Sequence, residues 1–151
     1  MEITSTAFKN GEKIPEIYAC DFENISPPLN WGAGPEGTKS YVLICDDPDA
    51  PSGTFVHWVV YNIPAEVTSL PENIPDSETL DNGATHGSTH FGSLGYGGPC
   101  PPSGNPHRYY FKIYAVDFIT AWKPGMSETK VMNRIEGHIL LQGELMGTYQ
   151  R

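Results

Sequence analysis

The chain has 151 residues, of which 38% are hydrophobic, enough to bury the core of one domain and too many for a disordered protein. Its 9 Lys and Arg residues against 18 Asp and Glu residues give a formal net charge of -9, which argues against nucleic acid as a partner. The 16 Gly and 14 Pro residues are too many for a helical bundle and favour short strands joined by structured loops. We therefore expect a single domain over residues 1–151, in which any phosphate is captured by a local cluster of donors.

The three cysteines, Cys20, Cys45 and Cys100, are odd in number, widely spaced and without a Cys-x-x-Cys pair. This pattern fits a reducing compartment, so we expect three buried, inert thiols. The amino terminus has no basic region followed by an apolar run, and no stretch approaches the ~18 apolar residues of a membrane span. We therefore expect a cytoplasmic protein without integral membrane association.

Residues 32–37 match the glycine fingerprint of dinucleotide-binding proteins, but a strand follows them instead of a helix, so they are interpreted as a turn. Three apolar runs, at 41–44, 55–63 and 108–116, are rich in β-branched and aromatic residues and are bounded by Gly, Pro or Asp, which predicts strands. Residues 109–116 carry large apolar groups at both alternating positions, as in a central strand that is covered on both sides.

Near the carboxyl end, apolar residues recur at helical spacing after Ser127, which suits an N-cap. These residues are Val131, Met132, Ile135, Ile139 and Met146. The spacing predicts one long helix that ends at Gly147, with Gly137 and Gly143 inside it at a cost of about 1 kcal/mol each relative to Ala.

His86 and His90 stand four residues apart, a spacing that on a helix would present two metal ligands on one face. The glycines at 83, 87, 92 and 95 disfavour a helix there. We expect exposed loop histidines in preference to a metal site.

The acidic segment 46–51, Asp-Asp-Pro-Asp-Ala-Pro, ends a hydrophobic strand with three carboxylates, and its two prolines stiffen the backbone. Taken alone, it is equally well explained as a turn in which Asp side chains cap their own backbone. His57 follows within the apolar strand at 55–61, where a single histidine is more often structural than functional.

Residues 95–109 form a Gly- and Pro-rich loop that runs into a core strand, and a purely structural loop does not explain the His107 and Arg108 at the strand entrance. The glycines allow backbone amides to approach a ligand, and the prolines limit collapse onto an empty site. Two histidines, a rigid acidic pair and exposed amides suit a zwitterionic phosphate ester, because imidazoles and amides donate to phosphate and carboxylates attract an ammonium. The same Asp and His residues could also ligate a metal.

Several segments together resemble the phosphatidylethanolamine-binding protein family, in its bacterial and archaeal branch described as Raf-kinase-inhibitor-like. The resemblance covers nearly the whole chain and is most specific in the combination of Asp-Pro-Asp-Ala-Pro with Gly-Pro…Pro-Pro…His-Arg-Tyr. The matching segments are residues 20–31, 47–51, 57–64, 95–109, 137–140 and 147–149. The resemblance implies a mainly β fold of two antiparallel Greek-key sheets with a carboxyl-terminal helix and a small pocket at one end.

The resemblance also implies which residues form that pocket, with Arg108 in a structural role. They are Asp47, Asp49, His57, Gly98, Pro99, His107 and Tyr109. The segment Thr89-His90-Phe91-Gly92 departs from the family pattern, which leaves open whether His90 faces the pocket. The same question is open for Cys100.

In relatives the pocket accepts phosphate, phosphoethanolamine-like head groups or other small anions, without catalytic turnover and without a cofactor or a required metal. We therefore expect an anion-binding protein that is not an enzyme and that docks to a protein partner such as a kinase; homodimer formation is left open. The alternative is a hydrolase or metalloenzyme that uses Asp47, Asp49, His57 and His107. No Ser or Cys lies beside a His in a recognisable nucleophile motif, which argues against acyl transfer.

Overall fold

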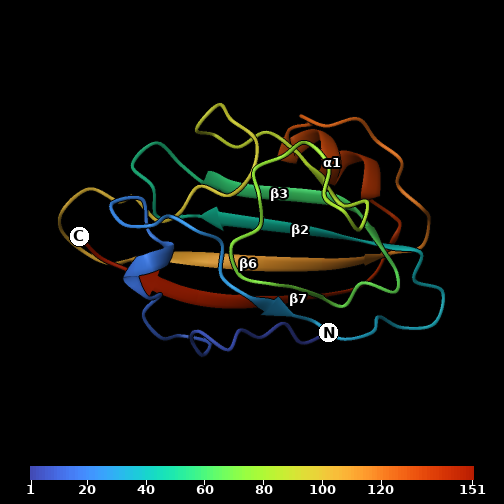
Figure 1. The fold of residues 1–151 in the computed structure, drawn as a ribbon, viewed down its shortest axis with the longest axis horizontal. Helices are drawn as coiled ribbons and strands as arrows, with labels where there is room; N and C mark the ends of the chain where they lie inside the picture. The colour runs from blue at the N-terminus through green and yellow to red at the C-terminus, as the bar shows by residue number, and fades with distance from the viewer.

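The computed structural model describes all 151 residues and consists mainly of two antiparallel sheets (Figure 1). The larger sheet has five strands in the order β5-β3-β2-β6-β7. These strands are β2 (Ser40–Asp47), β3 (Phe55–Pro64), β5 (Thr85–His86), β6 (His107–Val116) and β7 (Ile139–Tyr149). The other elements are β1 (Leu29–Asn30) and β4 (Ser69–Leu70), which pair as the smaller sheet, the 3-10 turn η1 (Glu16–Tyr18) and the helix α1 (Glu128–Ile135). The mainly β class and the three predicted strands are confirmed.

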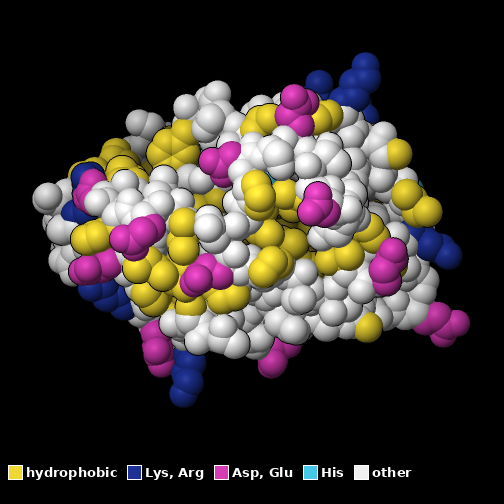
Figure 2. Space-filling view, viewed as in Figure 1, with side chains coloured by type: hydrophobic (Ala, Val, Ile, Leu, Met, Phe, Trp, Pro, Cys, Tyr) yellow, Lys and Arg dark blue, Asp and Glu magenta, His cyan; other side chains and the backbone are white.

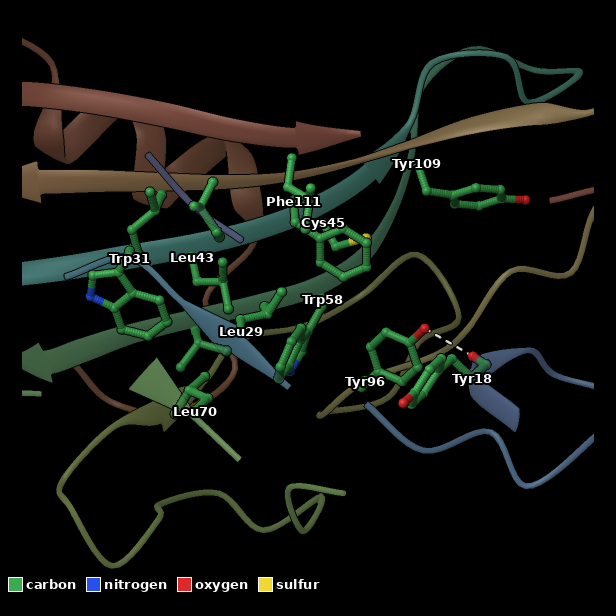
Figure 3. Close-up of a cluster of buried hydrophobic side chains, with 14 of the residues drawn as sticks. Tyr18, Leu29, Trp31, Leu43, Cys45, Trp58, Leu70, Tyr96, Tyr109 and Phe111 are labelled. Atoms are coloured by element: carbon green, nitrogen blue, oxygen red, sulfur yellow. Dashed lines mark hydrogen bonds between the residues drawn. The ribbon is translucent and has the colours of Figure 1, made fainter. Parts of the chain in front are cut away.

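Side chains along each strand point alternately to the two faces of the large sheet, and other parts of the chain cover both faces. On one face, Leu43, Trp58 and Phe111 belong to the larger hydrophobic cluster, shown in Figure 3. On the other face, the sheet packs against α1 through Val131 and Ile135, which are fully buried. Burial of each of these two side chains stabilises the fold by roughly 1.5–3 kcal/mol. β6 is therefore a central strand, as its sequence predicted.

The helix α1 is much shorter than the spacing of apolar residues predicted. Ser127 caps its start as expected, since its Oγ accepts a hydrogen bond from the Lys130 amide at 3.2 Å. Gly137 then adopts a φ of 81°, a left-handed conformation that commonly ends helices. From Ile139 the chain continues as β7, antiparallel to β6, so the prediction of one helix up to Gly147 is wrong. No helix of this protein combines the length and the apolar character needed to cross a bilayer.

Gly143, which would be unfavourable inside a long helix, is explained by the close approach of the amino-terminal backbone to β7. Gly143 lies opposite Ile113 in the register of β6 and β7. A Cβ atom at this position would lie 1.9 Å from the Met1 carbonyl oxygen, so no side chain fits there. The glycine is therefore required where the amino terminus packs against the edge strand.

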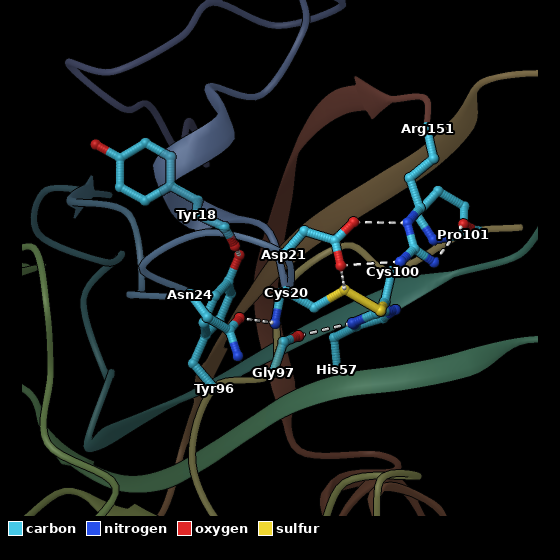
Figure 4. Close-up of a disulfide and its surroundings, with 11 residues drawn as sticks. Tyr18, Cys20, Asp21, Asn24, His57, Tyr96, Gly97, Cys100, Pro101 and Arg151 are labelled. Atoms are coloured by element: carbon cyan, nitrogen blue, oxygen red, sulfur yellow. Dashed lines mark hydrogen bonds and ion pairs between the residues drawn. A yellow bond between two sulfur atoms is a disulfide. The ribbon is translucent and has the colours of Figure 1, made fainter. Parts of the chain in front are cut away.

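Cys20 and Cys100 form a disulfide across 80 residues of sequence (Figure 4). Cys45 is a buried free thiol. The expectation of three unpaired thiols is therefore wrong for two of them. The inference of a reducing compartment from the cysteine pattern loses its basis, since disulfides persist mainly in oxidising surroundings.

Candidate functional site

A pocket of about 310 Å³ opens at the end of the sheet where β2 stops and where β3 and β6 begin. The antiparallel register produces this meeting point, because Asp47 pairs with Phe55 and Asp46 pairs with Tyr110. Four of the seven predicted site residues line it: Asp47, His57, His107 and Tyr109. The other lining residues are Ala50, Pro51, Phe55, Phe91, Cys100, Pro101 and Pro102.

His107 and Asp47 form a hydrogen-bonded pair in the pocket, with 2.7 Å between Nδ1 and Oδ2. Asp47 is almost fully buried, and its other oxygen accepts a hydrogen bond of 2.7 Å from the Asp49 amide. Because a carboxylate only accepts, Nδ1 of His107 carries the proton. The pair fixes the orientation of the imidazole ring and leaves Nε2 of His107 without a partner in the protein.

His57 is 3% exposed and lies on β3 in edge contact with the rings of Phe91 and Tyr109. Its Nδ1 donates a hydrogen bond to the Gly97 carbonyl oxygen at 2.7 Å (Figure 4). Burial lowers the pKa of His57 from its ordinary value of 6.5. At neutral pH Nε2 of His57 is therefore unprotonated, and it donates to a ligand only after the ring takes up a second proton.

The hydroxyl of Tyr109 is one of two buried side-chain polar atoms without a hydrogen-bond partner, the other being Nε1 of Trp31 in the main core. Tyr109 is 1% exposed, and Figure 3 shows its hydroxyl pointing away from the hydrophobic cluster. Burial raises the pKa of Tyr109 far above its ordinary value, and the nearby Asp47 carboxylate raises it further, so the hydroxyl remains a donor at physiological pH. The Asp47 carboxylate is the nearest candidate acceptor, but no hydrogen bond of normal geometry joins it to the hydroxyl. A buried donor without an acceptor costs about 1–3 kcal/mol, which a bound acceptor would offset.

Asp49, which the resemblance placed in the pocket, does not line it. Its carboxylate is bound by Arg108, with 2.9 Å from Nε to Oδ2 and 2.8 Å from Nη2 to Oδ1, and the Arg108 amide also donates to Oδ2. These hydrogen bonds lower the pKa of Asp49 to about 2. The interaction ties the acidic loop to the start of β6, so Asp49 and Arg108 support the pocket from outside.

Gly98 and Pro99 are buried and do not line the pocket either. The Gly98 amide donates to Oδ1 of Asn24 at 2.8 Å, and a Cβ atom here would lie 1.9 Å from the Tyr18 carbonyl oxygen. The Pro99 carbonyl oxygen accepts a hydrogen bond from the Cys20 amide at 3.0 Å. In this structure the Gly98 amide therefore holds the loop against the amino-terminal segment and does not face the pocket.

The apolar rim of the pocket is the part that sequence reasoning missed. The rings of Phe55 and Phe91 lie in edge contact, with centroids 4.8 Å apart, and Phe91 is 44% exposed. Pro101 and Pro102 contribute to the rim together with the disulfide-bonded Cys100. In the sequence, the only signal for this rim is that Phe91 lies in the segment that departs from the family pattern.

Neither His86 nor His90 lines the pocket, although the ring of His90 is in edge contact with that of Phe55. His86 is fully buried and its Nε2 accepts a hydrogen bond from Nε1 of Trp58 at 3.1 Å, so the expectation of an exposed loop histidine is wrong for it. His90 is exposed, and its Nδ1 accepts from the Val56 amide at 3.1 Å. Nowhere in the protein do three or more imidazole, thiol or carboxylate groups come together in a way that could hold a metal ion.

The whole chain is similar to proteins of one family. The family model of the phosphatidylethanolamine-binding protein matches residues 4–150. The UPF0098 protein of Methanothermobacter thermautotrophicus is 49% identical over 151 residues, which cover all of this chain and 99% of the relative. The UPF0098 protein of Aquifex aeolicus is also 49% identical, over all of this chain and 89% of the relative.

Solved structures show the same similarity. CT736 of Chlamydia trachomatis, a putative phosphatidylethanolamine-binding protein homologue, has a TM-score of 0.90 and 39% identity, with 99% of this chain and 97% of that chain covered. YbcL of E. coli, named as a new member of the mammalian family, has a TM-score of 0.91 and 36% identity, with 99% and 98% covered. The chain described here therefore belongs to the phosphatidylethanolamine-binding protein family.

Proposed function

We propose that the pocket binds a phosphate monoester of the phosphoethanolamine type, or a similar small anion. The observation that carries this proposal is the buried Tyr109 hydroxyl, a donor without an acceptor in a pocket that also holds His57 and His107. A phosphate oxygen would accept from Tyr109. The imidazolium form of His107, held by Asp47 through Nδ1, would donate to the same anion from Nε2.

The lining supports an ester with a small organic part. Phe55, Phe91 and three prolines give the rim apolar surface against which carbon atoms can pack. The volume of about 310 Å³ is at the low end for ligand pockets, so it suits a head group and not a whole lipid. A phosphorylated residue on a protein partner such as a kinase would present the same chemistry, and docking of such a partner extends the proposal.

The lining also supports binding over turnover. Cys100 is the only Ser, Thr or Cys residue in it, and because its sulfur is in the disulfide the lining offers no serine, threonine or thiol nucleophile for a covalent intermediate. The pair of Asp47 and His107 favours one second candidate, a hydrolase in which His107 acts as a general base toward water. Sustained release of inorganic phosphate from phosphoethanolamine, lost in His107→Ala, would favour the hydrolase over the binding protein.

Calorimetric titration of phosphoethanolamine tests the binding proposal. His57→Ala and His107→Ala should each weaken binding roughly ten- to a hundredfold, because a hydrogen bond to a charged group contributes about 1.5–3 kcal/mol. His138→Ala is the control, since His138 also pairs with a carboxylate, that of Asp117, but lies outside the pocket. Unchanged affinity in both pocket variants would contradict the proposal.

A further inference from the structure

A second hollow, of about 620 Å³, lies beside the amino-terminal end of α1 and has twice the volume of the pocket described above. It is lined by residues 121–127, which lead into the helix, and by Lys130 and Arg134 of α1. In Figure 2, Lys and Arg side chains stand out from the edge of the molecule above the place where Figure 1 shows α1.

The lining of this hollow is basic, although the whole chain is strongly acidic. Three of the nine Lys and Arg residues line it, namely Lys123, Lys130 and Arg134, and no Asp or Glu does. None of these three exposed side chains forms an ion pair, whereas four other basic residues do: Lys13, Arg108, Lys112 and Arg151. Lys130 and Arg134 are four residues apart on α1 and therefore share one face of the helix. Three positive charges without ion-pair partners at one hollow repel one another, and an anion bound among them would relieve this repulsion.

The floor of the hollow is held in place by β3. The hydroxyl of Tyr61 accepts a hydrogen bond from the Met126 amide at 3.1 Å and donates one to the Lys123 carbonyl oxygen. Asn62 holds both sides of Trp122, since its Nδ2 donates to the Trp122 carbonyl oxygen at 2.8 Å and its Oδ1 accepts from the Trp122 amide at 3.1 Å. A floor fixed in this way needs little ordering when a ligand binds.

The arrangement of charges selects the class of ligand. The cations come from two elements, the segment 121–127 and α1, and a chain of linked phosphates carries several charges along its length with which to meet them, whereas a single phosphate carries its charge at one point. The guanidinium of Arg134 already lies over the Trp122 ring, 5.8 Å from its centroid, so this ring face is not free to stack on a nucleobase. We propose that the hollow is a second anion site, separate from the pocket of His57 and His107, and that it binds a polyphosphate chain.

Titration of the ¹⁵N-labelled protein with inorganic triphosphate at low salt tests this site independently of the first pocket, because NMR reports each amide separately. The expected result is a set of saturating shifts among residues 122–134, with an affinity that falls steeply as salt is added. Lys123→Gln/Lys130→Gln/Arg134→Gln should weaken this set about 10- to 100-fold, since each exposed pair contributes up to about 1 kcal/mol. Any shifts that triphosphate causes at His107 or Tyr109 should be the same in this variant as in the wild-type protein.

The control variant removes three charges elsewhere, Lys9→Gln/Lys13→Gln/Lys39→Gln, and should retain triphosphate binding. The six replaced side chains are exposed, so thermal unfolding should change only slightly in both variants, through loss of the Arg134–Trp122 contact in one and of the Lys13–Glu16 ion pair in the other. Adenosine triphosphate should bind like inorganic triphosphate if the phosphate chain alone is recognised. If adenosine triphosphate instead binds more tightly, and the Lys123/Lys130/Arg134 variant loses this binding too, the site is supported and its ligand is a nucleotide. Absence of shifts at 122–134, or equal binding by the two triple variants, would overturn the proposal.

Discussion

At the scale of single residues, Tyr109 and His57 prepare the pocket in different ways. The Tyr109 hydroxyl is a donor at every physiological pH, whereas His57 gains its second donor only on protonation. The Tyr109 hydroxyl has no hydrogen-bond partner in the protein, and His57 uses only its Nδ1, which leaves Nε2 for a ligand. The two residues therefore predict different changes, one on substitution and one on titration.

Tyr109→Phe should weaken phosphoethanolamine binding by about tenfold and should leave the empty protein as stable as before, or up to about 1 kcal/mol more stable. The gain arises because the variant removes a buried hydroxyl that has no partner. Tyr96→Phe is the control: its hydroxyl donates to the Tyr18 carbonyl oxygen at 2.8 Å, so its loss should lower stability and spare binding. Calorimetry and urea denaturation measure both quantities, and a Tyr109→Phe variant that binds normally would argue against a donor role.

The pH dependence of binding follows from the lowered pKa of His57. Between the unfolded value of 6.5 and the lower folded value, the unfolded chain binds more protons than the folded one, so the stability of the empty protein decreases as pH falls through this window. An anion favours the protonated ring, so affinity should rise as pH falls through the same window. Sulfate is the suitable probe, because its own charge stays constant there. In His57→Gln the rise should be reduced, and an affinity that falls with decreasing pH would contradict the role of His57.

The sequence predicted the pocket residues best where they lie on strands. Asp47, His57 and Tyr109, which the resemblance assigned, lie within β2, β3 and β6, where pairing with the neighbouring strands fixes the direction of each side chain. Asp49 and Gly98 lie in loops, and their directions are set by Arg108 and by Asn24, a partner 74 residues away. Loop side chains therefore could not be assigned from the motif, although the motif located the loops correctly.

At the scale of elements, the long-helix prediction failed where local and non-local preferences compete. Residues 128–135 follow the helical period and form α1, capped by Ser127. From Ile139 onward the same apolar residues also suit a strand, and pairing along β6 decides the outcome. Periodicity within a segment does not reveal the neighbour against which that segment will pair.

The disulfide between Cys20 and Cys100 predicts a joint loss of stability and of affinity. It closes a loop across 80 residues, for which the chain-entropy model gives about 4.5 kcal/mol. Cys100 lines the pocket, so Cys20→Ser/Cys100→Ser should also weaken phosphoethanolamine binding. Thermal unfolding with and without reductant measures the effect, and the reductant should leave the double variant unchanged. A fully reduced wild-type protein with unaltered stability would refute this prediction.

At the scale of the whole molecule, positive charge is scarce and only partly compensated by ion pairs. The 18 Asp and Glu residues exceed the 9 Lys and Arg residues, and four of those nine form ion pairs. Only the hollow beside α1 gathers unpaired positive charge, on Lys123, Lys130 and Arg134. The basic residues at this hollow therefore attract anions at short range, while the long-range field of the molecule repels them.

This balance predicts that the protein does not bind anionic bilayers, whatever head group its pocket accepts. Three basic residues near a surface contribute about 3 kcal/mol in total, too little to retain a molecule whose net charge is -9. The pocket has about 310 Å³, so a bilayer lipid would have to leave its layer to occupy it. In flotation assays at low salt, the protein should stay with the soluble fraction in the presence of phosphatidylserine vesicles, as it should with neutral vesicles. Strong co-flotation with the anionic vesicles, reversed by added salt, would show that local charge outweighs the net charge.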